Sequence, residues 1–285
     1  MRIYYQLPQI PWRTERTHLI MEQGLVGWEL VKNPNDADYI ILPSTFYGLH
    51  MLRYPNPFPP EKTIFLDWWD TTDCHSLECF CYYKRSWASH IDHGDYVEKT
   101  HCEWPSHYRP LSFCALNEFI VPEVERTIDV GCFLTPYYKN RRNVIEVVNN
   151  LKMVKQVGVV GDSGVKGRSG FNEDFYRAMR SCRVVVTCQP DRWEGDYRTW
   201  EALASGALVF VDKLITPLVH PLVDGEHCIF YDVGNLSELK EKLEHYAYHR
   251  EKAETIARRG HEFVLKHHMA INRVQDILKM LKKNY

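Results

Sequence analysis

Residues 197–211 read YRTWEALASGALVFV and decide the fold that this chain is expected to adopt. Residues 197–206 have the spacing of a short helix, and residues 207–212 follow as an apolar run, the pattern of a strand buried on both faces of a sheet. Small residues near the end of the helix allow it to pack closely on that strand. A helix that leads directly into a buried strand is typical of an α/β domain with a parallel sheet.

The alternation of strand and helix extends from this stretch in both directions. In the second half the patterns predict strand 127–134, helix 140–151, strand 155–162, helix 171–182, strand 183–189, helix 197–206, strand 207–212, strand 227–232 and helix 236–268, with a break at Gly260. In the first half they predict strand 2–7, helix 15–25 and strands 27–31, 36–43 and 62–73. An irregular segment at 103–125 that contains several prolines is the expected linker.

These two series predict an α/β protein with two Rossmann-like domains that face each other across a cleft. We expect the first domain to span residues 1–120 and the second to span 121–265. Ligands of open α/β sheets bind at the carboxyl ends of the strands. Residues that follow the predicted strands are therefore the candidates for a functional site.

The composition excludes several classes of function. The chain has 285 residues, 45% of them hydrophobic and 25% charged, and its formal net charge is −2. It therefore has no general positive field for nucleic acid. No apolar stretch approaches the roughly 18 residues that a membrane span needs, and the first residues lack the apolar centre of a signal peptide. We expect a cytoplasmic protein, a monomer or weak dimer, without a nucleic-acid partner.

The nine cysteines are scattered along the chain and do not indicate a disulfide framework. Cys74, Cys79 and Cys81, with His75 nearby, raise the alternative of a zinc site. Their spacing matches no usual ligand pattern. Buried thiols are the preferred interpretation, and neither a metal nor a cofactor is expected.

A cation and a carboxylate share one face of the helix in the opening stretch. Arg198 lies in its first turn and Glu201 lies three residues later. The guanidinium offers a fork of donors to a phosphate, and the carboxylate accepts hydrogen bonds from a ribose diol. The alternative is an ion pair within the helix on a solvated face.

The context of this pair resembles a known family. Residues 198–206 read RTWEALASG, and an Asp-Gly pair and an apolar strand follow; this pattern resembles the donor-binding half of glycosyltransferases with the GT-B fold, including exostosin-like and CgeB-like members. The resemblance covers about residues 128–265. It implies that Glu201 grips the ribose of a nucleotide-sugar and that Arg198 faces the phosphates. It also implies that a C-terminal helix at 266–285 packs back on the first domain.

Two further segments of the second half are candidates for binding the donor. Lys139, Arg141 and Arg142 lie at the start of a predicted helix, where they form a potential diphosphate clamp; the alternative is a basic exposed turn. The glycine-rich segment 158–170 does not match a dinucleotide fingerprint. We expect Gly161 and Asp162 to contact the donor through the backbone, although a plain surface loop is an equal alternative.

An acidic loop in the first half is the candidate source of a catalytic base. Asp67, Asp70 and Asp73 follow a predicted strand, and crowding of carboxylates raises the pKa of one of them. A carboxylate at this position can remove the proton of an acceptor hydroxyl. Asp73 is preferred, then Asp70, with His75 as an outside candidate. The alternative is a solvated acidic loop, with Asp67 paired to Arg85.

Aromatic residues near the first strands are candidates for binding an acceptor sugar. Tyr5, Trp12 and Arg13 lie at or after the first strand, and Trp69 follows a later one. Aromatic faces stack on the C–H faces of sugar rings. The alternative is core packing, which some of the tryptophans must provide.

The sequence therefore predicts a glycosyltransferase that moves a sugar from a UDP-sugar to a hydroxyl of a glycan. We expect direct displacement with inversion and no metal, because the helix dipole and the basic residues hold the leaving diphosphate. The chain also resembles chlorovirus-encoded transferases that build capsid glycans, including a xylosyltransferase. That resemblance implies UDP-xylose as donor, a fucose-containing acceptor and a location in the host cytoplasm. A UDP-sugar epimerase and a glycan-binding protein without turnover are the alternatives.

Overall fold

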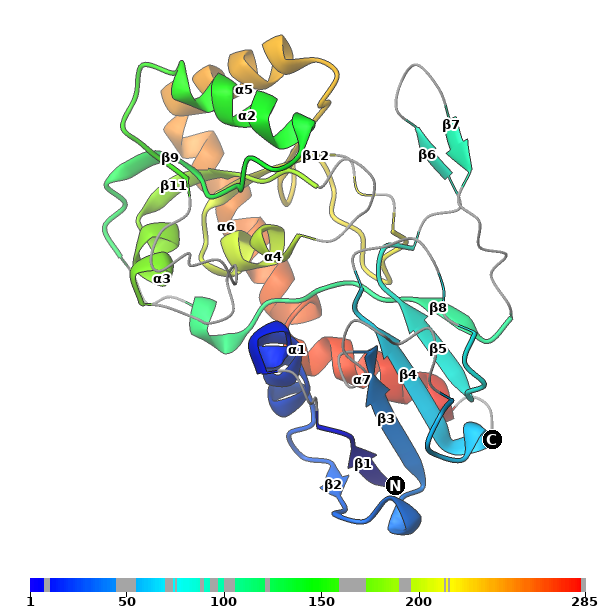
Figure 1. The fold of residues 1–285 in the computed structure, drawn as a ribbon. Coiled ribbons are helices and arrows are strands. Elements are labelled where there is room, and N and C mark those ends of the chain that lie inside the picture. The colour runs from blue at the N-terminus through cyan, green and yellow to red at the C-terminus, as the bar shows by residue number, and fades with distance from the viewer. Residues whose placement is uncertain are drawn as a thin grey trace. The chain divides into compact units, whose positions relative to one another are not determined.

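The computed structural model describes most of the chain. It describes residues 1–7, 11–44, 55–69, 74, 76–87, 90–92, 97–99, 106–120, 124–158, 173–189, 196–212, 214 and 216–282; the side chains of 11–16, 90–92, 97–99, 173, 280 and 282 are left out. Contacts divide the chain into two compact units, which consist mainly of residues 1–112 and 113–285 (Figure 1).

The first unit contains a six-stranded parallel sheet with the order β2-β1-β3-β4-β5-β8. Its elements are β1 (Arg2–Tyr5), α1 (Pro11–Gly24), β2 (Glu29–Leu30), β3 (Tyr39–Pro43), β4 (Thr63–Asp67), β5 (Cys81–Lys84), the β6–β7 pair (His90–Asp92 and Val97–Lys99) and β8 (Tyr108–Pro110), with short 3-10 turns at Pro34–Asp36 and Pro60–Lys62. All five residues of β3 and of β4 are buried. This is expected of central parallel strands that are covered on both faces.

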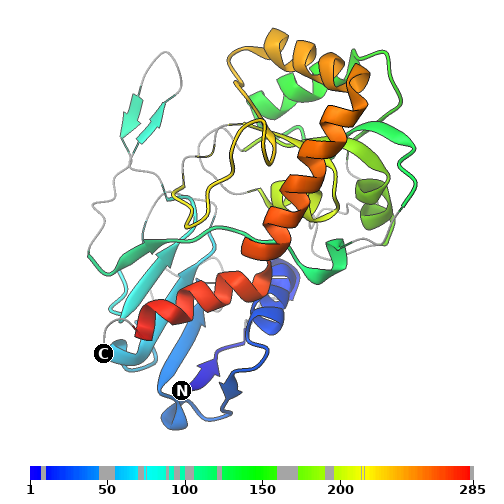
Figure 2. The ribbon, with the colours of Figure 1, turned by 180° about the vertical axis from the view of Figure 1, so that it is seen from behind.

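The second unit contains a five-stranded parallel sheet with the order β10-β9-β11-β12-β13. Its elements are a 3-10 turn (Asn117–Phe119), β9 (Ile128–Cys132), α2 (Lys139–Asn149), β10 (Lys155–Val157), α3 (Glu173–Arg180), β11 (Cys182–Val186), α4 (Tyr197–Ala204), β12 (Leu208–Asp212), β13 (Ile229–Tyr231), α5 (Leu236–Tyr248), α6 (Arg250–His267) and α7 (Ala270–Lys282). Helices α2 and α5 lie on one face of this sheet, and α3 and α4 lie on the other (Figures 1 and 2).

The core of the second unit follows from the alternation of side chains along its strands. Val130 and Cys132 of β9, and Val184 and Val186 of β11, point to the same face and join one buried apolar cluster. Val144 and Val148 of α2 and Leu239 and Leu243 of α5 complete that cluster, at positions one helical turn apart. The predicted Rossmann-like architecture of this half is confirmed.

The structure differs from the sequence prediction at the linker. Residues 103–125 were expected to be irregular throughout, but β8 at Tyr108–Pro110 pairs in parallel with β5 and is the edge strand of the first sheet. The boundary between the units lies after Ser112. The predicted packing of the C-terminal helix on the first domain stays a prediction.

The predicted helix break at Gly260 is wrong. The long helical segment breaks at His249, which ends α5 and begins α6, and Gly260 lies buried inside α6. A Cβ at position 260 would lie 2.1 Å from the carbonyl oxygen of His227 and 3.0 Å from Leu203 Cδ2. The glycine therefore allows α6 to approach the backbone before β13, rather than ending the helix.

We predict that Gly260→Ala destabilises the protein, because no position of the new methyl group avoids the His227 carbonyl. The expected loss in the free energy of unfolding is about 2 kcal/mol or more, the size of an overpacked core, measured by urea denaturation. Gly234→Ala is the matched control, since the atom nearest to its Cβ, at 3.3 Å, belongs to the Asp232 side chain. Equal stability of the two variants would contradict this account of Gly260.

Candidate functional site

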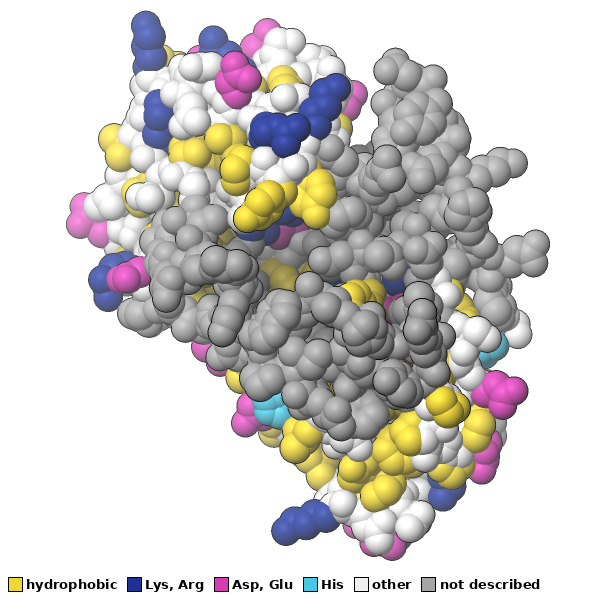
Figure 3. Space-filling view, viewed as in Figure 1, with side chains coloured by type: hydrophobic (Ala, Val, Ile, Leu, Met, Phe, Trp, Pro, Cys, Tyr) yellow, Lys and Arg dark blue, Asp and Glu magenta, His cyan; other side chains and the backbone are white. Residues whose placement is uncertain are grey.

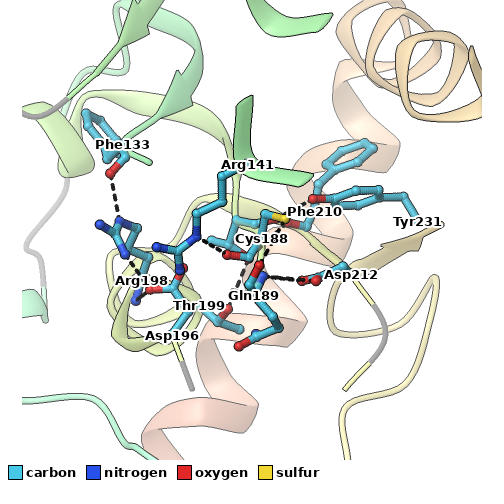
Figure 4. Close-up of polar contacts among 11 residues, drawn as sticks. Phe133, Arg141, Cys188, Gln189, Asp196, Arg198, Thr199, Phe210, Asp212 and Tyr231 are labelled. Atoms are coloured by element: carbon cyan, nitrogen blue, oxygen red, sulfur yellow. Dashed lines mark hydrogen bonds and ion pairs between the residues drawn. The ribbon is translucent and has the colours of Figure 1, made fainter. Parts of the chain in front are cut away.

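The candidate site lies at the carboxyl ends of two neighbouring strands in the second unit. The chain leaves β9 at Cys132 and returns through β10 on one side and β11 on the other, so strand order reverses between β9 and β11. In doubly wound sheets a ligand binds outside the carboxyl ends of the strands at such a point. Helices α2 and α4 begin near these strand ends, and their first residues form the site (Figure 4).

Asp196 organises the start of α4. It is the N-cap of the helix, and its Oδ1 accepts a hydrogen bond from the backbone N–H of Arg198 at 3.0 Å. The same oxygen accepts a second bond from Arg198 Nη1 at 2.7 Å, and Oδ2 lies 3.3 Å from Arg141 Nη2. The exposed fraction of the side chain is 1% for Asp196 and 6% for each arginine. One buried carboxylate thus joins two buried guanidinium groups.

Each guanidinium also binds the end of a strand. Arg198 Nε donates to the carbonyl oxygen of Phe133, just after β9, at 2.7 Å. Arg141 Nε donates to the carbonyl oxygen of Cys188, just after β11, at 2.9 Å. Two guanidinium charges and one carboxylate leave a net charge of +1 on this buried group. The arrangement attracts an anion and ties both helices to the reversal point of the sheet.

Glu201 lies on the same helix, three residues after Arg198. The residue is 2% exposed, so its carboxylate lies inside the protein rather than on a solvated face. Next to it, Thr199 Oγ1 lies 3.0 Å from Thr187 Oγ1, and this contact joins α4 to the end of β11. The structure thus brings Arg198 and Glu201 together with Arg141 at one end of the sheet. It contradicts the alternative that Arg198 and Glu201 lie on a solvent-exposed face.

A third buried carboxylate, Asp212, lies at the end of β12. Both oxygens of Asp212 accept a hydrogen bond from the backbone N–H of Gln189, at 3.0 and 2.9 Å. The neighbouring hydroxyl of Tyr231 donates to the carbonyl oxygen of Thr187 at 2.6 Å. These bonds fix the segment 187–189 that forms the floor of the site.

The N-terminus of α2 differs from that of α4, because no side chain caps it. Tyr138 is the N-cap, and its side chain makes no capping hydrogen bond with the first turn; the positive end of a helix dipole favours an anion at such a position. Lys139 and Arg142 are exposed there, and basic side chains lie over α2 in Figure 3. Arg142 Nη1 donates to the carbonyl oxygens of Pro136 and Tyr137 at 3.2 and 2.9 Å.

The predicted basic trio is therefore divided. Arg141 is buried and pairs with Asp196, whereas Lys139 and Arg142 lie at the surface of the first turn of α2. Positions that are two and three residues apart on a helix do not all share one face, which explains this division.

The candidate residues of the first unit lie at the carboxyl end of its sheet. Tyr5 ends β1, and its ring stacks on His18 of α1 with ring centroids 6.1 Å apart. Burial raises the pKa of the Tyr5 phenol. Trp69 follows β4, is half-buried, and donates its backbone N–H to Asp67 Oδ1 at 3.0 Å. The side chains of Trp12 and Arg13 lie outside the described residues.

Asp67 is a buried structural residue. Its ion pair is with Lys84 at 3.1 Å, and both side chains are 0% exposed. The parallel register places Asp67 opposite Lys84, which explains why Lys84 forms this ion pair in place of the Arg85 that the alternative interpretation named. The Tyr82 hydroxyl donates to Asp67 Oδ2 at 2.7 Å.

Several predicted site residues lie outside the described part of the chain. They are Asp70, Asp73, His75, Gly161 and Asp162. Their predicted roles stay predictions.

Sequence reasoning missed three residues that hold the site together: Asp196, Asp212 and Gln189. Asp196 carried a usable signal, because an Asp immediately before a predicted helix is an N-cap candidate. Asp212 and Gln189 carried none, since their contact joins residues 23 positions apart.

Two ring-stacking contacts hold α4 in place. Tyr197 stacks on Phe113 with ring centroids 3.5 Å apart, and Trp200 stacks on His268 at 4.5 Å. His268 lies between α6 and α7, where its Nδ1 is 3.1 Å from Arg273 Nη2 and its Nε2 is 2.8 Å from the carbonyl oxygen of His220. Burial, with the charge of Arg273, lowers the pKa of His268 to about 2. His268 is therefore neutral in the folded protein at ordinary pH.

Other kinds of site are less well supported in the described part of the chain. There, no group of three or more His, Cys, Asp and Glu side chains is placed to hold a metal ion. Burial raises the pKa of Cys132 and of Cys182 to about 12, so these thiols are inert packing residues. Each described helix is too short or too polar to cross a bilayer.

The comparisons with known proteins agree with the geometry. Residues 141–279 match a family model described as glycosyl transferase-like. The matched segment begins at Arg141 and contains Asp196, Arg198 and Glu201. Comparison with curated protein sequences gives no significant match.

Solved structures share the fold over nearly the whole chain. The Anabaena protein HepE, solved in complex with UDP-glucose, is 12% identical with a TM-score of 0.59, and the alignment covers 99% of both chains. Sucrose-phosphate synthase from Thermosynechococcus elongatus is 10% identical with a TM-score of 0.59, covering 98% of this chain and 80% of that one. An alpha-glucosyltransferase in complex with UDP-glucose and DNA is 10% identical with a TM-score of 0.58, covering 99% and 98%. The chain therefore has the GT-B fold, with two Rossmann-like domains, as predicted.

We predict that Asp196→Ala destabilises the protein by about 3–5 kcal/mol, because it leaves two buried guanidinium groups without their carboxylate. The measurement is the free energy of unfolding in urea. Asn235→Ala is the matched control: Asn235 caps α5 at an exposed position without buried cations, so its loss costs about 1 kcal/mol. Equal losses would show that Asp196 acts only as a cap.

We also predict that His268 makes the folded state sensitive to acid. The pKa of His268 in the folded state, about 2, is below the ordinary 6.5. Below pH 6.5 the unfolded state therefore binds a proton at His268 that the folded state does not bind. The stabilisation is complete above pH 6.5 and declines by up to about 1.4 kcal/mol for each unit that the pH falls below it. Unfolding free energies between pH 8 and 5 should fall more steeply for the wild type than for His268→Gln; parallel curves would contradict the assignment.

Proposed function

We propose that this chain is a glycosyltransferase that moves a sugar from a UDP-sugar donor to a hydroxyl of a glycan. The observation that carries the proposal is the buried Arg141–Asp196–Arg198 group, which places a net positive charge at the reversal point of a GT-B sheet. The family match over residues 141–279 and the fold shared with proteins solved in complex with UDP-glucose support it.

The diphosphate of the donor binds, in this proposal, between the uncapped N-terminus of α2 and the arginine pair. The backbone N–H groups of α2 and the exposed Lys139 and Arg142 meet one side of the diphosphate. Arg198 uses Nε and Nη1 for Phe133 and Asp196, and its Nη2 has no hydrogen-bond partner within the described residues. That group is left for a phosphate oxygen.

Glu201 accepts hydrogen bonds from the ribose hydroxyls. It lies one helical turn beyond Arg198, and side chains at this spacing are about 5–6 Å apart, which matches neighbouring sugar and phosphate groups of one nucleotide. Its burial excludes water, so these charge-assisted bonds are strong. We further propose that the backbone at Gly161 and Asp162 contacts the donor.

The cations at the diphosphate stabilise the leaving group, so the proposal requires no metal ion. The acceptor hydroxyl attacks the anomeric carbon as its proton passes to Asp73, or to Asp70 in its place, and the bond to the UDP oxygen breaks, with inversion.

The acceptor is bound, in this scheme, by Tyr5, Trp12, Arg13 and Trp69. Xylose as the transferred sugar and a fucose-containing acceptor are the specific forms of the proposal, and UDP-xylose is the first donor to test.

We predict that Glu201→Gln weakens UDP binding by at least about tenfold, because a neutral amide accepts weaker hydrogen bonds from the ribose than a carboxylate does. Isothermal titration with UDP measures this, and Glu251→Gln on the exposed face of α6 is the matched control. Undiminished affinity in Glu201→Gln would remove Glu201 from the donor site.

We predict that Asp73→Asn keeps UDP binding and lowers the rate of transfer by about 100-fold or more, the usual contribution of a general base. The assay measures UDP release from UDP-xylose and UDP-glucose, with and without fucosylated and other glycan acceptors. Normal turnover by Asp73→Asn would exclude it as the base. Conversion of the donor into an epimer, without dependence on an acceptor, would favour the epimerase alternative.

A further inference from the structure

A separate cavity opens at the other end of the second unit's sheet. Its volume is about 730 Å³, within the range of about 300–1,000 Å³ that small-ligand sites occupy. It is lined by the first residues of β9 and β11, the turn between α4 and β12, the end of α5 and the first three turns of α6. The candidate donor site lies at the carboxyl ends of the same strands, and a five-residue strand is about 16 Å long.

One face of α6 forms a wall of this cavity; α6 is the long orange helix of Figure 2. The lining positions on it are 250, 253, 254, 257, 258 and 261, which is the spacing of a single helical face. Arg250, Glu254 and Arg258 follow one another at intervals of four residues along this face. Ala253 and Ala257 lie between them, and their short side chains leave the cavity open.

The three charged side chains are not paired with each other. Residues of opposite charge four positions apart on a helix can form ion pairs, but none joins Arg250 or Arg258 to Glu254 in the described part of the chain, and all three residues are exposed. None of the three side chains forms a hydrogen bond with another described residue. Two guanidinium groups and a carboxylate are therefore open to a ligand.

Three other charged residues of the lining, Arg126, Asp129 and Arg183, are already paired and form a rigid rim, while the exposed Glu125 adds a further carboxylate at the edge of the cavity. Arg126 donates to the backbone carbonyls of Arg180, Cys182 and Ser205. Asp129 pairs with Arg183 at 3.1 Å. These groups hold the amino ends of the strands together, and they are not needed for binding.

The order of charges selects the chemistry of the ligand. An anion that bridged Arg250 and Arg258 would lie against the carboxylate of Glu254, and a cation would meet two guanidinium groups. A neutral polyhydroxyl compound avoids both conflicts, since each hydroxyl donates to a carboxylate and accepts from a guanidinium. His261 adds to this set: with Nδ1 donating to the carbonyl oxygen of Leu203 at 3.2 Å, its Nε2 remains an acceptor.

We propose that this cavity, defined by Arg250, Glu254, Arg258 and His261, is a second saccharide-binding site that takes an uncharged oligosaccharide. The alanines offer an apolar surface to the C–H groups of the sugar rings, and the charged residues bind their hydroxyls. The site is distinct from the donor site and does not depend on the proposed transfer activity. It allows the protein to hold a glycan chain away from the reacting centre.

The test is a titration of the full-length protein with four neutral trisaccharides: maltotriose, cellotriose, mannotriose and xylotriose. Affinity is measured by isothermal titration and by protein-observed NMR up to 20 mM sugar. At least one trisaccharide should bind, and Arg258→Ala and Glu254→Gln should each weaken it by about tenfold. The matched controls Arg259→Ala and Glu251→Gln, exposed on the same helix but outside the cavity, should stay within about twofold of the wild type.

Two anions and UDP serve as control ligands in the same experiment. Pyrophosphate and glucose 6-phosphate should bind equally to the wild type and to Arg258→Ala, because Glu254 keeps anions away from the two arginines, and UDP should bind equally to all four variants. The proposal is overturned if no trisaccharide binds, if trisaccharide binding is unchanged in Arg258→Ala and Glu254→Gln, or if Arg258→Ala weakens the binding of either anion to the protein. Loss of UDP binding in Glu201→Gln would leave this result unaffected, so the two proposals fail independently.

Discussion

The interaction on which the second unit depends is the carboxylate of Asp196 held between the guanidinium groups of Arg141 and Arg198. Two buried cations cost several kcal/mol to desolvate, and Asp196 with the carbonyls of Phe133 and Cys188 offsets that cost. Because these partners follow β9 and β11, the ion pairs also fix the starts of α2 and α4. The same contacts therefore serve the fold and leave a residual positive charge at the position proposed for the donor diphosphate.

The two helix N-termini at this site have different roles. Asp196 caps α4 with its own carboxylate, so the positive end of that helix is already partly used. The N-cap of α2, Tyr138, makes no side-chain capping bond, and exposed basic residues lie in the first turn. In the proposed function, α2 meets the phosphates while α4 presents Arg198 and Glu201 to the rest of the nucleotide. Stacking of Tyr197 and Trp200 on Phe113 and His268 holds α4 in place for that purpose.

The second sheet has functional chemistry at both ends, but of different kinds. At the carboxyl ends the Arg141–Asp196–Arg198 group is buried and paired and carries a net positive charge, which suits an anionic nucleotide. At the amino ends the charges of α6 are exposed, unpaired with each other and alternating in sign, which suits a neutral sugar. Gly260 sets the position of α6 at the amino end, because only a residue without a side chain lets α6 lie against the backbone before β13.

The sequence by itself determined the parallel α/β architecture, because apolar runs such as those of β3, β4 and β12 are long enough to show burial on both faces. It also pointed to Arg198 and Glu201, since both lie within one helical turn. It wrongly placed a helix break at Gly260 and offered Arg85, rather than Lys84, as the alternative partner of Asp67, because neither a glycine nor a nearby charge shows which residues pack against it. Only the tertiary structure decided that Arg141 is buried while Lys139 and Arg142 are exposed, and that Asp196 joins two helices. Those outcomes depend on contacts between residues about 50 positions apart, whose partners no local pattern records.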